Sequence, residues 1–171
     1  PWKISAKKIQ HDKIKKQFIY KNAWLELYDF PVAYFPKFFH PDPSVKRQSG
    51  LLSPEIGSHE ILGDSIYLPY FYVISDNQDM TLKPRLFNNN TLVLQTEYRQ
   101  ETKNSLTIID SSITKGHYSD KDNKADKDTR SHLFTKTNID LGYKEFINSK
   151  LEIMYEKISN DTYLKLFDFI K

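Results

Sequence analysis

The chain contains no cysteine among its 171 residues and only five glycines. Without cysteine, a disulfide framework and thiolate metal sites are excluded, and composition gives no redox compartment. No stretch approaches the run of about 18 apolar residues that a transmembrane helix needs. The longest apolar run, Ile66–Ile74, has the length of a strand. Scarce glycine together with 11 Tyr and 11 Phe favours strands over a disordered chain.

Motifs for catalysis are also absent. The net charge of +3 is too small to indicate nucleic-acid binding. There is no GxSxG motif and no phosphate-binding glycine-rich loop. None of the five histidines belongs to a metal-spaced cluster; His40 with Asp42 and His59 with Glu60 come nearest, and such pairs are more typical of turn residues in water. We expect no enzyme, no catalytic residue, no metal site and no cofactor.

What the sequence does contain is strict alternation of apolar and polar residues, which is typical of strands with one apolar and one polar face. In segment 79–87, Met80, Leu82 and Leu86 alternate with charged residues, and a short polar turn follows. Long alternating strands with short turns favour the wall of a barrel with lipid outside and water inside. The strands expected here are Leu51–Gly57, Ser65–Ile74, Asp79–Phe87, Thr91–Thr102, Ser105–Thr114, Ser131–Tyr143, Lys150–Ile158 and Thr162–Ile170.

The chain divides into three parts. Residues 1–40 hold short alternating pieces at intervals of roughly ten residues, which indicates stacked rungs of a solenoid or jelly roll. Residues 41–49 combine prolines with a basic, aperiodic run, as at a domain junction. Residues 50–171 carry the alternating strands, interrupted by the charged stretch 116–130, where we expect an exposed loop. Because the chain starts with Pro and ends within a strand-like segment, we expect an internal fragment of a larger protein.

The motifs PVAYFP, FHPDPSVKRQSG, LLSPEIG and YLPYFYVISDNQDMTLKPR follow one another between Pro31 and Arg99. Their order and spacing resemble the lipopolysaccharide-assembly family LptD, also called the OstA-type organic solvent tolerance family, and a weaker similarity returns as SNDTYLKLFDF at residues 159–169. The resemblance implies an all-β fold, in which the end of a periplasmic β-jelly roll precedes the first antiparallel strands, about eight, of an outer-membrane β-barrel.

The same resemblance implies a function. Lipopolysaccharide would pass through the jelly roll and leave sideways through a gate at the first barrel strand, into the outer leaflet of a Gram-negative outer membrane. The N-terminal part would lie in the periplasm. The implied partners are lipopolysaccharide, the outer-membrane lipoprotein plug LptE and the periplasmic bridge protein LptA, in addition to the membrane itself.

Two prolines interrupt the first two expected barrel strands, Pro54 and Pro69. Proline cannot donate to a strand ladder, so it marks edges or bulges. Each missing hydrogen bond costs about 0.5–1.5 kcal/mol in water, and several kcal/mol in hydrocarbon. From the residues alone, a weak section of the wall and a pair of bulges that curve the sheet fit equally well. The resemblance implies that both prolines are residues of the lateral gate.

Apolar and basic residues share the segment 1–40. Lipopolysaccharide carries phosphates on a multi-acyl anchor, so its path needs an apolar trough with cations near the mouth. The lysines fit that description or a solvated sheet edge. The apolar residues fit a lipid path or the jelly-roll core, and the resemblance implies that the interior is itself the path. The candidates are Trp2, Ile4, Ile9, Phe18, Trp24, Leu25 and Leu27.

Four aromatic residues surround Pro69. A tyrosine at a membrane–water boundary keeps its ring in lipid and its hydroxyl in water, which suits an interfacial girdle, whereas phenylalanine would serve a soluble core equally well. The candidate membrane-interface aromatics are Tyr67, Tyr70, Phe71 and Tyr72.

Two other interpretations stay open. A general porin-type outer-membrane channel would have the same strands without a gate. A soluble β-sandwich that binds carbohydrate would bury the apolar face of Met80, Leu82 and Leu86 against a second sheet. The lack of cysteine departs from better-known members of the LptD family, which join periplasmic domain and barrel by disulfides. A redox checkpoint on assembly is therefore unsupported by this sequence.

Overall fold

The computed structural model describes residues 2–45, 47–119, 124–143, 149–160 and 162–167, and within 116–128 only the backbone is described. The described chain is all-β apart from one short helix, as the sequence predicted. Its elements are β1 (Trp2–Asp12), β2 (Gln17–Leu27), β3 (Phe30–Pro41), β4 (Gly50–Leu51), β5 (Glu55–His59), β6 (Gly63–Tyr67), β7 (Tyr70–Ser75), β8 (Gln78–Phe87), β9 (Leu92–Glu101), β10 (Ser105–Ser119), β11 (Lys124–Asp140), β12 (Lys150–Ile158) and α1 (Tyr163–Leu166). Among these residues, no helix is long and apolar enough to cross a membrane.

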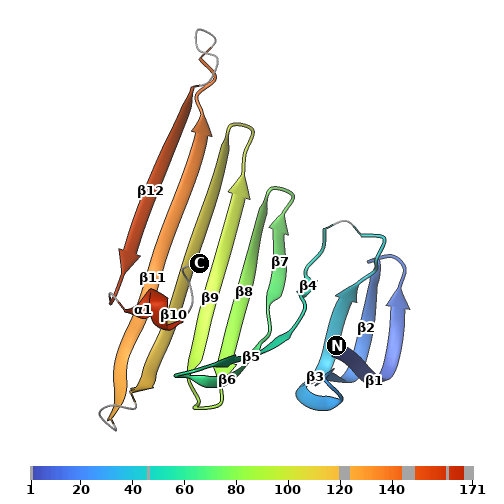
Figure 1. The fold of residues 1–171 in the computed structure, drawn as a ribbon. Helices are drawn as coiled ribbons and strands as arrows, with labels where there is room; N and C mark the ends of the chain where they lie inside the picture. Colours follow the sequence, from blue (N-terminus) through green and yellow to red (C-terminus); the bar gives the residue numbers. More distant parts are fainter. Residues whose placement is uncertain (1, 46, 120–123, 144–148, 161, 168–171) are drawn as a thin grey trace.

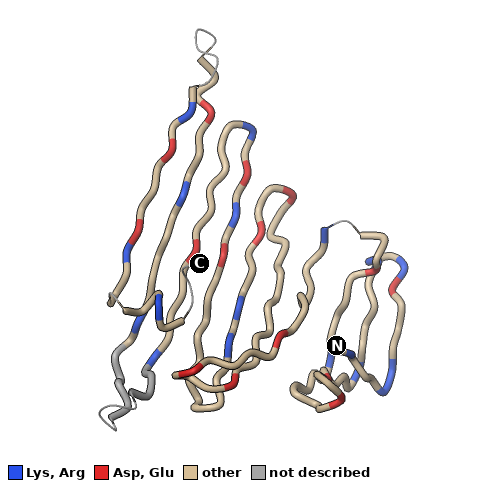
Figure 2. Tube along the Cα trace, viewed as in Figure 1, with Lys and Arg blue, Asp and Glu red and all other residues tan. Residues whose placement is uncertain are grey.

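The N-terminal strands form a separate antiparallel sheet in the order β1-β2-β3 (Figure 1). Its second hairpin turns at two consecutive residues in the left-handed region, Tyr28 (φ 49°) and Asp29 (φ 70°), which is the geometry of a tight two-residue hairpin. Along β2, Ala23, Leu25 and Leu27 are buried while the residues between them are not. Lysines and acidic residues lie along and between these strands (Figure 2).

The remaining strands form one antiparallel, nine-stranded sheet in the order β12-β11-β10-β9-β8-β6-β5 (Figure 1). Strand β7 pairs with β8 beyond the end of β6, and β4 pairs with β7. Short polar turns join β7 to β8 and β8 to β9, as predicted from the sequence. Among the described strands the sheet is open, with β4, β5 and β12 at its edges.

The first two expected barrel strands are each broken in two. The segment 51–57 becomes β4 and β5, separated at residues 52–54, and the segment 65–74 becomes β6 and β7, separated at Leu68 and Pro69. Both breaks occur at a proline, because proline has no N–H to continue the ladder.

The strand expected at Thr162–Ile170 is wrong. Residues 163–166 form the helix α1, and residues 168–171 lie outside the described part. The side chain of Asn160 accepts a hydrogen bond from the N–H of Thr162 (3.0 Å), and the carbonyl of Thr162 accepts one from Leu166 (3.0 Å), which starts a helical turn. Apolar residues at 163, 164, 166 and 167 fit one side of a helix as well as a strand.

The loop expected at residues 116–130 is also largely wrong. Strand β10 continues to Ser119 and β11 begins at Lys124, with backbone pairs out to Ser119 opposite Lys124. The turn itself, residues 120–123, lies outside the described residues. Backbone pairing does not require apolar side chains, so a charged stretch can extend a hairpin beyond the body of the sheet.

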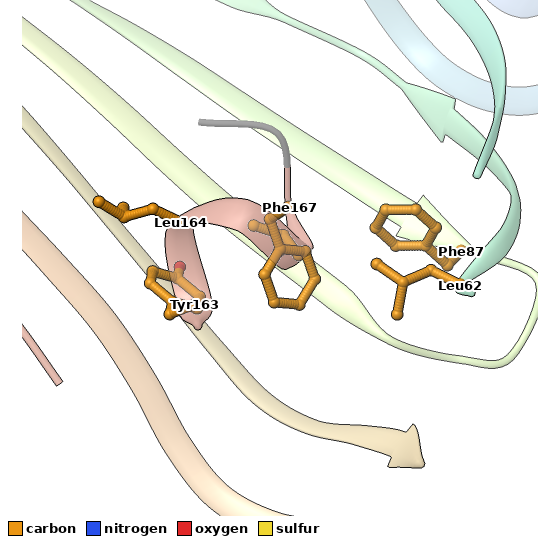
Figure 3. Packing of buried hydrophobic residues seen from close by; sticks show 6 residues of the cluster. Leu62, Phe87, Tyr163, Leu164 and Phe167 are labelled. Carbon is orange, nitrogen blue, oxygen red and sulfur yellow. The ribbon is translucent and has the colours of Figure 1, made fainter. Parts of the chain in front are cut away.

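The main apolar core of the described residues lies at the end of the large sheet near the β5–β6 turn. There, side chains of α1 and of the residue that follows it pack against Leu62 in that turn and against Phe87 and Val93 (Figure 3). The cluster consists of Leu62, Phe87, Val93, Tyr163, Leu164 and Phe167, with Phe134 and Leu166 packed against it.

Candidate functional site

One face of the nine-stranded sheet is apolar and exposed. Directly opposed residues of antiparallel strands share a face, which here joins Leu86 to Leu92 and Leu94 to Ile113. Leu92 is 52% exposed and Ile113 51%. A contiguous exposed apolar face of this kind indicates contact with a membrane or a partner. Its exposed members include Tyr72, Leu86, Leu92, Leu94, Ile113, Leu133, Leu151, Ile153 and Tyr155.

This exposure bears on the soluble-sandwich interpretation. A sandwich needs the apolar face covered by a second sheet. Leu86 remains 51% exposed, and Met80 and Leu82 are only half-buried. The described part of the chain therefore does not bury the face that a sandwich would bury.

The opposite face carries polar side chains bonded across strands, and at one end it holds Phe87 and Val93 of the apolar cluster. The Lys83 Nζ donates to Glu97 at 2.7 Å, from β8 to β9. Asp110 on β10 accepts hydrogen bonds from the Gln95 amide (3.0 Å) and from the His132 Nε2 (2.9 Å). Buried polar groups are retained in a fold when they are satisfied in this way. One face thus suits an apolar medium and the other an aqueous one.

A cationic clamp fixes the junction to this polar face. Arg47 donates through Nη1 to the carbonyls of Ser75 (2.9 Å), the last residue of β7, and of Asp76 in the following turn. Its Nη2 lies 2.6 Å from the Asp79 carboxylate, whose other oxygen accepts from the Arg99 Nε at 2.8 Å. Asp79 is only 6% exposed, and two guanidinium groups balance its charge.

Neither this clamp nor a second polar group around His132 was predicted from the sequence. In the second group the Ser112 hydroxyl contacts the His132 Nδ1 (2.8 Å) and the hydroxyl of Tyr163. Counting alternation in the expected strands would have placed Asp79 and Arg99 on one face. Only the register showed that Asp79 pairs directly with Arg99 and Ser112 with His132.

The structure places both proposed gate prolines at the strand breaks, where both are buried. The pairing shifts there: Gly50 opposes Phe71 and Glu55 opposes Tyr67, so five residue steps on one strand face four on the other. The Leu52 N–H donates to the Pro69 carbonyl at 2.9 Å. A bulge and an interruption of strand pairing therefore coincide here, and the role of Pro54 and Pro69 in a gate stays a prediction.

The four interface aromatics divide between the two faces. Tyr70 opposes Leu82 and Tyr72 opposes Met80, on the apolar face. Phe71 opposes Thr81, and Tyr67 opposes Arg85, whose guanidinium carbon lies 5.4 Å from the centre of the Tyr67 ring. Of the four, only Tyr70 and Tyr72 lie on the apolar face, and an interfacial role for these aromatics stays a prediction.

The candidate lipid-path residues do not form one cluster. Trp2 opposes Leu27 and Ile4 opposes Leu25, so these four share a face of the small sheet. Trp24 lies on the other face, with its ring centroid 5.0 Å from that of Tyr34. Two further candidates lie toward the β1–β2 turn. Ile9 is 56% exposed, and the Phe18 ring stacks on that of His11 with ring centroids 4.5 Å apart.

The histidines take structural roles where their bonds are described. The His59 Nδ1 accepts from the backbone N–H groups of Ile61 (3.1 Å) and Leu62 (3.2 Å), as a turn residue does. His11 Nε2 lies 2.8 Å from Asp42, whereas the sequence had suggested His40 as the nearest partner of Asp42. In the residues that the structure describes, no three His, Cys, Asp or Glu side chains gather as metal ligands would.

Comparison with known proteins gives one consistent result. The LPS-assembly protein LptD of Legionella pneumophila (strain Paris) is 35% identical over 104 residues, which cover 61% of this chain and 12% of that protein. LptD of Ralstonia nicotianae is 29% identical over 163 residues, 95% of this chain and 19% of that protein. LptD of Pseudoalteromonas translucida is 36% identical over 102 residues, 60% of this chain and 14% of that protein.

No family model matches the chain. The chain spans between 12% and 19% of the length of these three relatives. The resemblance that the motifs between Pro31 and Arg99 indicated is confirmed: the sequence matches part of LptD.

Proposed function

We propose that this chain, whose sequence matches part of the LPS-assembly protein LptD, serves in lipopolysaccharide transport to the outer leaflet of a Gram-negative outer membrane. The observation that carries the proposal is the two-faced sheet, apolar and exposed on one side, charged and hydrogen-bonded on the other. A sheet of this kind is stable where lipid meets the first face and water the second. In this role the chain is a conduit and not an enzyme.

Residues 50–171 form the first strands of a transmembrane β-barrel in this proposal. The lengths support it: β8 and β9 have ten residues each and β12 has nine. A tilted membrane strand needs about 9–11 residues. The polar face, with Lys83, Glu97 and Asp110, then lines the lumen, and Tyr70 and Tyr72 lie on the lipid side.

Residues 1–40 form the last rungs of a periplasmic jelly roll, and residues 41–49 the junction. Of the seven lipid-path candidates, Trp2, Ile4, Leu25 and Leu27 are the best supported, because they share one face of the β1–β3 sheet. Lipopolysaccharide would slide along that face before reaching the barrel. The proposed partners are LptA on the periplasmic side and the plug LptE within the barrel.

The gate lies at the β4–β5 edge in this proposal. Strand pairing there is interrupted at Pro54 and Pro69, and β5 has β6 as its neighbour among the described strands. An interrupted edge separates from a closing strand at lower cost than a continuous one, because fewer hydrogen bonds break.

Depleting the full-length protein that carries this chain in its Gram-negative cell tests the function. We expect lipopolysaccharide at the cell surface to fall while newly made lipopolysaccharide accumulates inside. Depletion of an abundant porin is the control and should leave surface lipopolysaccharide unchanged. Unaltered surface lipopolysaccharide after full depletion would contradict the proposal and favour a general channel.

Replacing both prolines by alanine tests the gate. The Pro54→Ala/Pro69→Ala variant can form the missing ladder bonds, so we expect transport to slow while the barrel still assembles. Pro36→Ala is the control, because Pro36 is an exposed residue of β3 in the other sheet, outside both strand breaks. Equal transport by the double variant and this control would exclude a gating role for the prolines.

A further inference from the structure

We propose that α1 is a latch that holds the β5–β6 hairpin folded over the polar face of the sheet, and that the hairpin pivots at Pro54 and Pro69 when the latch opens. The inference rests on the proposed function for its consequence, since the hairpin belongs to the first two strands. The latch itself is defined by contacts within the described residues.

The apolar half of the latch is the cluster around Phe167 (Figure 3). Leu62, at the hairpin turn, is 1% exposed, and Phe167 is 3% exposed. The Phe167 ring centroid lies 6.2 Å from that of Phe87 and 5.3 Å from that of Tyr163. The turn of the hairpin is therefore covered by residues about a hundred positions later in the chain.

The polar half anchors α1 to the middle of the sheet. The Tyr163 hydroxyl bonds Ser112, which bonds the His132 Nδ1, while the His132 Nε2 lies 2.9 Å from Asp110. With a neutral imidazole, Nε2–H donates to the carboxylate and Nδ1 must accept. Ser112 then donates to His132 and accepts from Tyr163. Every hydroxyl in this line has a defined partner, which fixes the position of α1.

The rest of the hairpin is held less extensively. Strand β6 pairs with β8 over three residue pairs, from Ser65 opposite Phe87 to Tyr67 opposite Arg85. Gly63 in this turn has φ 78°, a backbone conformation that favours glycine. Beyond these pairs, both connections to β4 and β7 pass through a proline break. The hairpin can thus move as a unit when the cluster separates and the few β6–β8 pairs break.

Cross-linking across the latch tests whether it must open. In the full-length protein, Leu62→Cys/Phe167→Cys is joined by a short cleavable bismaleimide; this chain contributes no other cysteine. We expect the assembled, cross-linked protein to lose lipopolysaccharide transport and to regain it on cleavage. The control, Ser58→Cys/Asp64→Cys, joins two exposed, opposed residues within the hairpin and should transport normally. Equal transport by both cross-linked proteins would overturn the latch.

Labelling of the hairpin tests the latch without any transport assay. Tyr163→Phe removes the hydroxyl that bonds Ser112, and we expect Leu62→Cys to react about five-fold faster with a soluble maleimide, the factor that loss of one net hydrogen bond gives. Tyr155→Phe, on the apolar face, is the control and should leave the rate unchanged. An unchanged rate in Tyr163→Phe and also in Phe167→Ala would overturn the latch, whereas failure of depletion to affect lipopolysaccharide would overturn only the proposed function.

Discussion

The two sheets share the same alternation of residues, but one apolar face of each differs in burial. In the β1–β3 sheet the apolar residues Ala23, Leu25 and Leu27 are between 0% and 3% exposed. In the nine-stranded sheet Leu86 and Leu92 are just over half exposed. Alternation thus determines that a strand has two faces, while the medium that each face meets decides what is stable. The small sheet buries the face that carries Leu25 and Leu27, although Trp24 on its other face is 44% exposed. The large sheet exposes the face that carries Leu86 and Leu92.

Truncating one buried and one exposed leucine tests the difference in burial between the two sheets, and it should give the largest effect on stability. Leu25→Ala should destabilise the N-terminal part by about 2–5 kcal/mol, because a fully buried side chain leaves a cavity. Leu86→Ala should change stability by less than about 1 kcal/mol, since this side chain has no tightly packed protein cavity to vacate. Protease resistance of the two parts, titrated with denaturant in the full-length protein, measures both. Similar losses at the two sites would contradict the difference in burial.

Adding a charge to each face of β9 in turn tests whether the two faces of the large sheet meet different media. Leu94→Arg places a guanidinium on the apolar face and should cost about 2–4 kcal/mol at the bilayer midplane, and less near its edges. Gln95→Arg is the matched control one residue away on the polar face, where Asp110 can pair with it. The yield of folded, heat-modifiable barrel on gels reports the effect. Equal yields would show that the apolar face does not meet lipid.

Acid should destabilise the small sheet through Asp42. This is the smallest of the three predicted changes in stability. Hydrogen bonds from Ser44, and then from His11, lower the pKa of Asp42 below its usual value. A depressed carboxyl pKa stabilises the fold above the unfolded pKa of about 4 and loses that contribution as the pH falls through the folded pKa. Asp42→Asn should therefore flatten the loss of stability below about pH 4. Intrinsic fluorescence during acid titration measures this loss of stability. An Asp42→Asn variant that unfolds at the same pH as the parent protein would exclude a contribution of Asp42 to acid unfolding.

Most of the sheet could be predicted from the sequence, because alternation and polar turns are local signals. Segments 79–87 and 91–102 match β8 and β9 within a residue or so. The residue content of the candidate surface followed as well: Met80, Leu82 and Leu86 alternate with charges. The breaks in the first two strands were visible as prolines, although two continuous strands were expected.

What the sequence could not give depends on contacts between distant residues. Helix α1 has apolar residues that suit a strand or a helix, and its helical form coincides with packing on Leu62 and Phe87. The clamp joins Arg47 to Asp79, 32 positions away, and the Ser112–Tyr163 contact spans 51 positions. No local pattern reports such pairings, because they depend on the register of the folded sheet.

The Arg47 clamp also limits the distance by which the small sheet can move away from the large one. Six residue steps separate Pro41, the last residue of β3, from Arg47, and a fully extended chain covers at most about 3.6 Å per step, or roughly 22 Å. Because Arg47 is bonded to the turn between β7 and β8, only the six residue steps from Pro41 to Arg47, and not the whole nine-residue junction, allow the two sheets to separate. A movement of the small sheet beyond that reach must pull on the β7–β8 turn, next to the strand interrupted at Pro69.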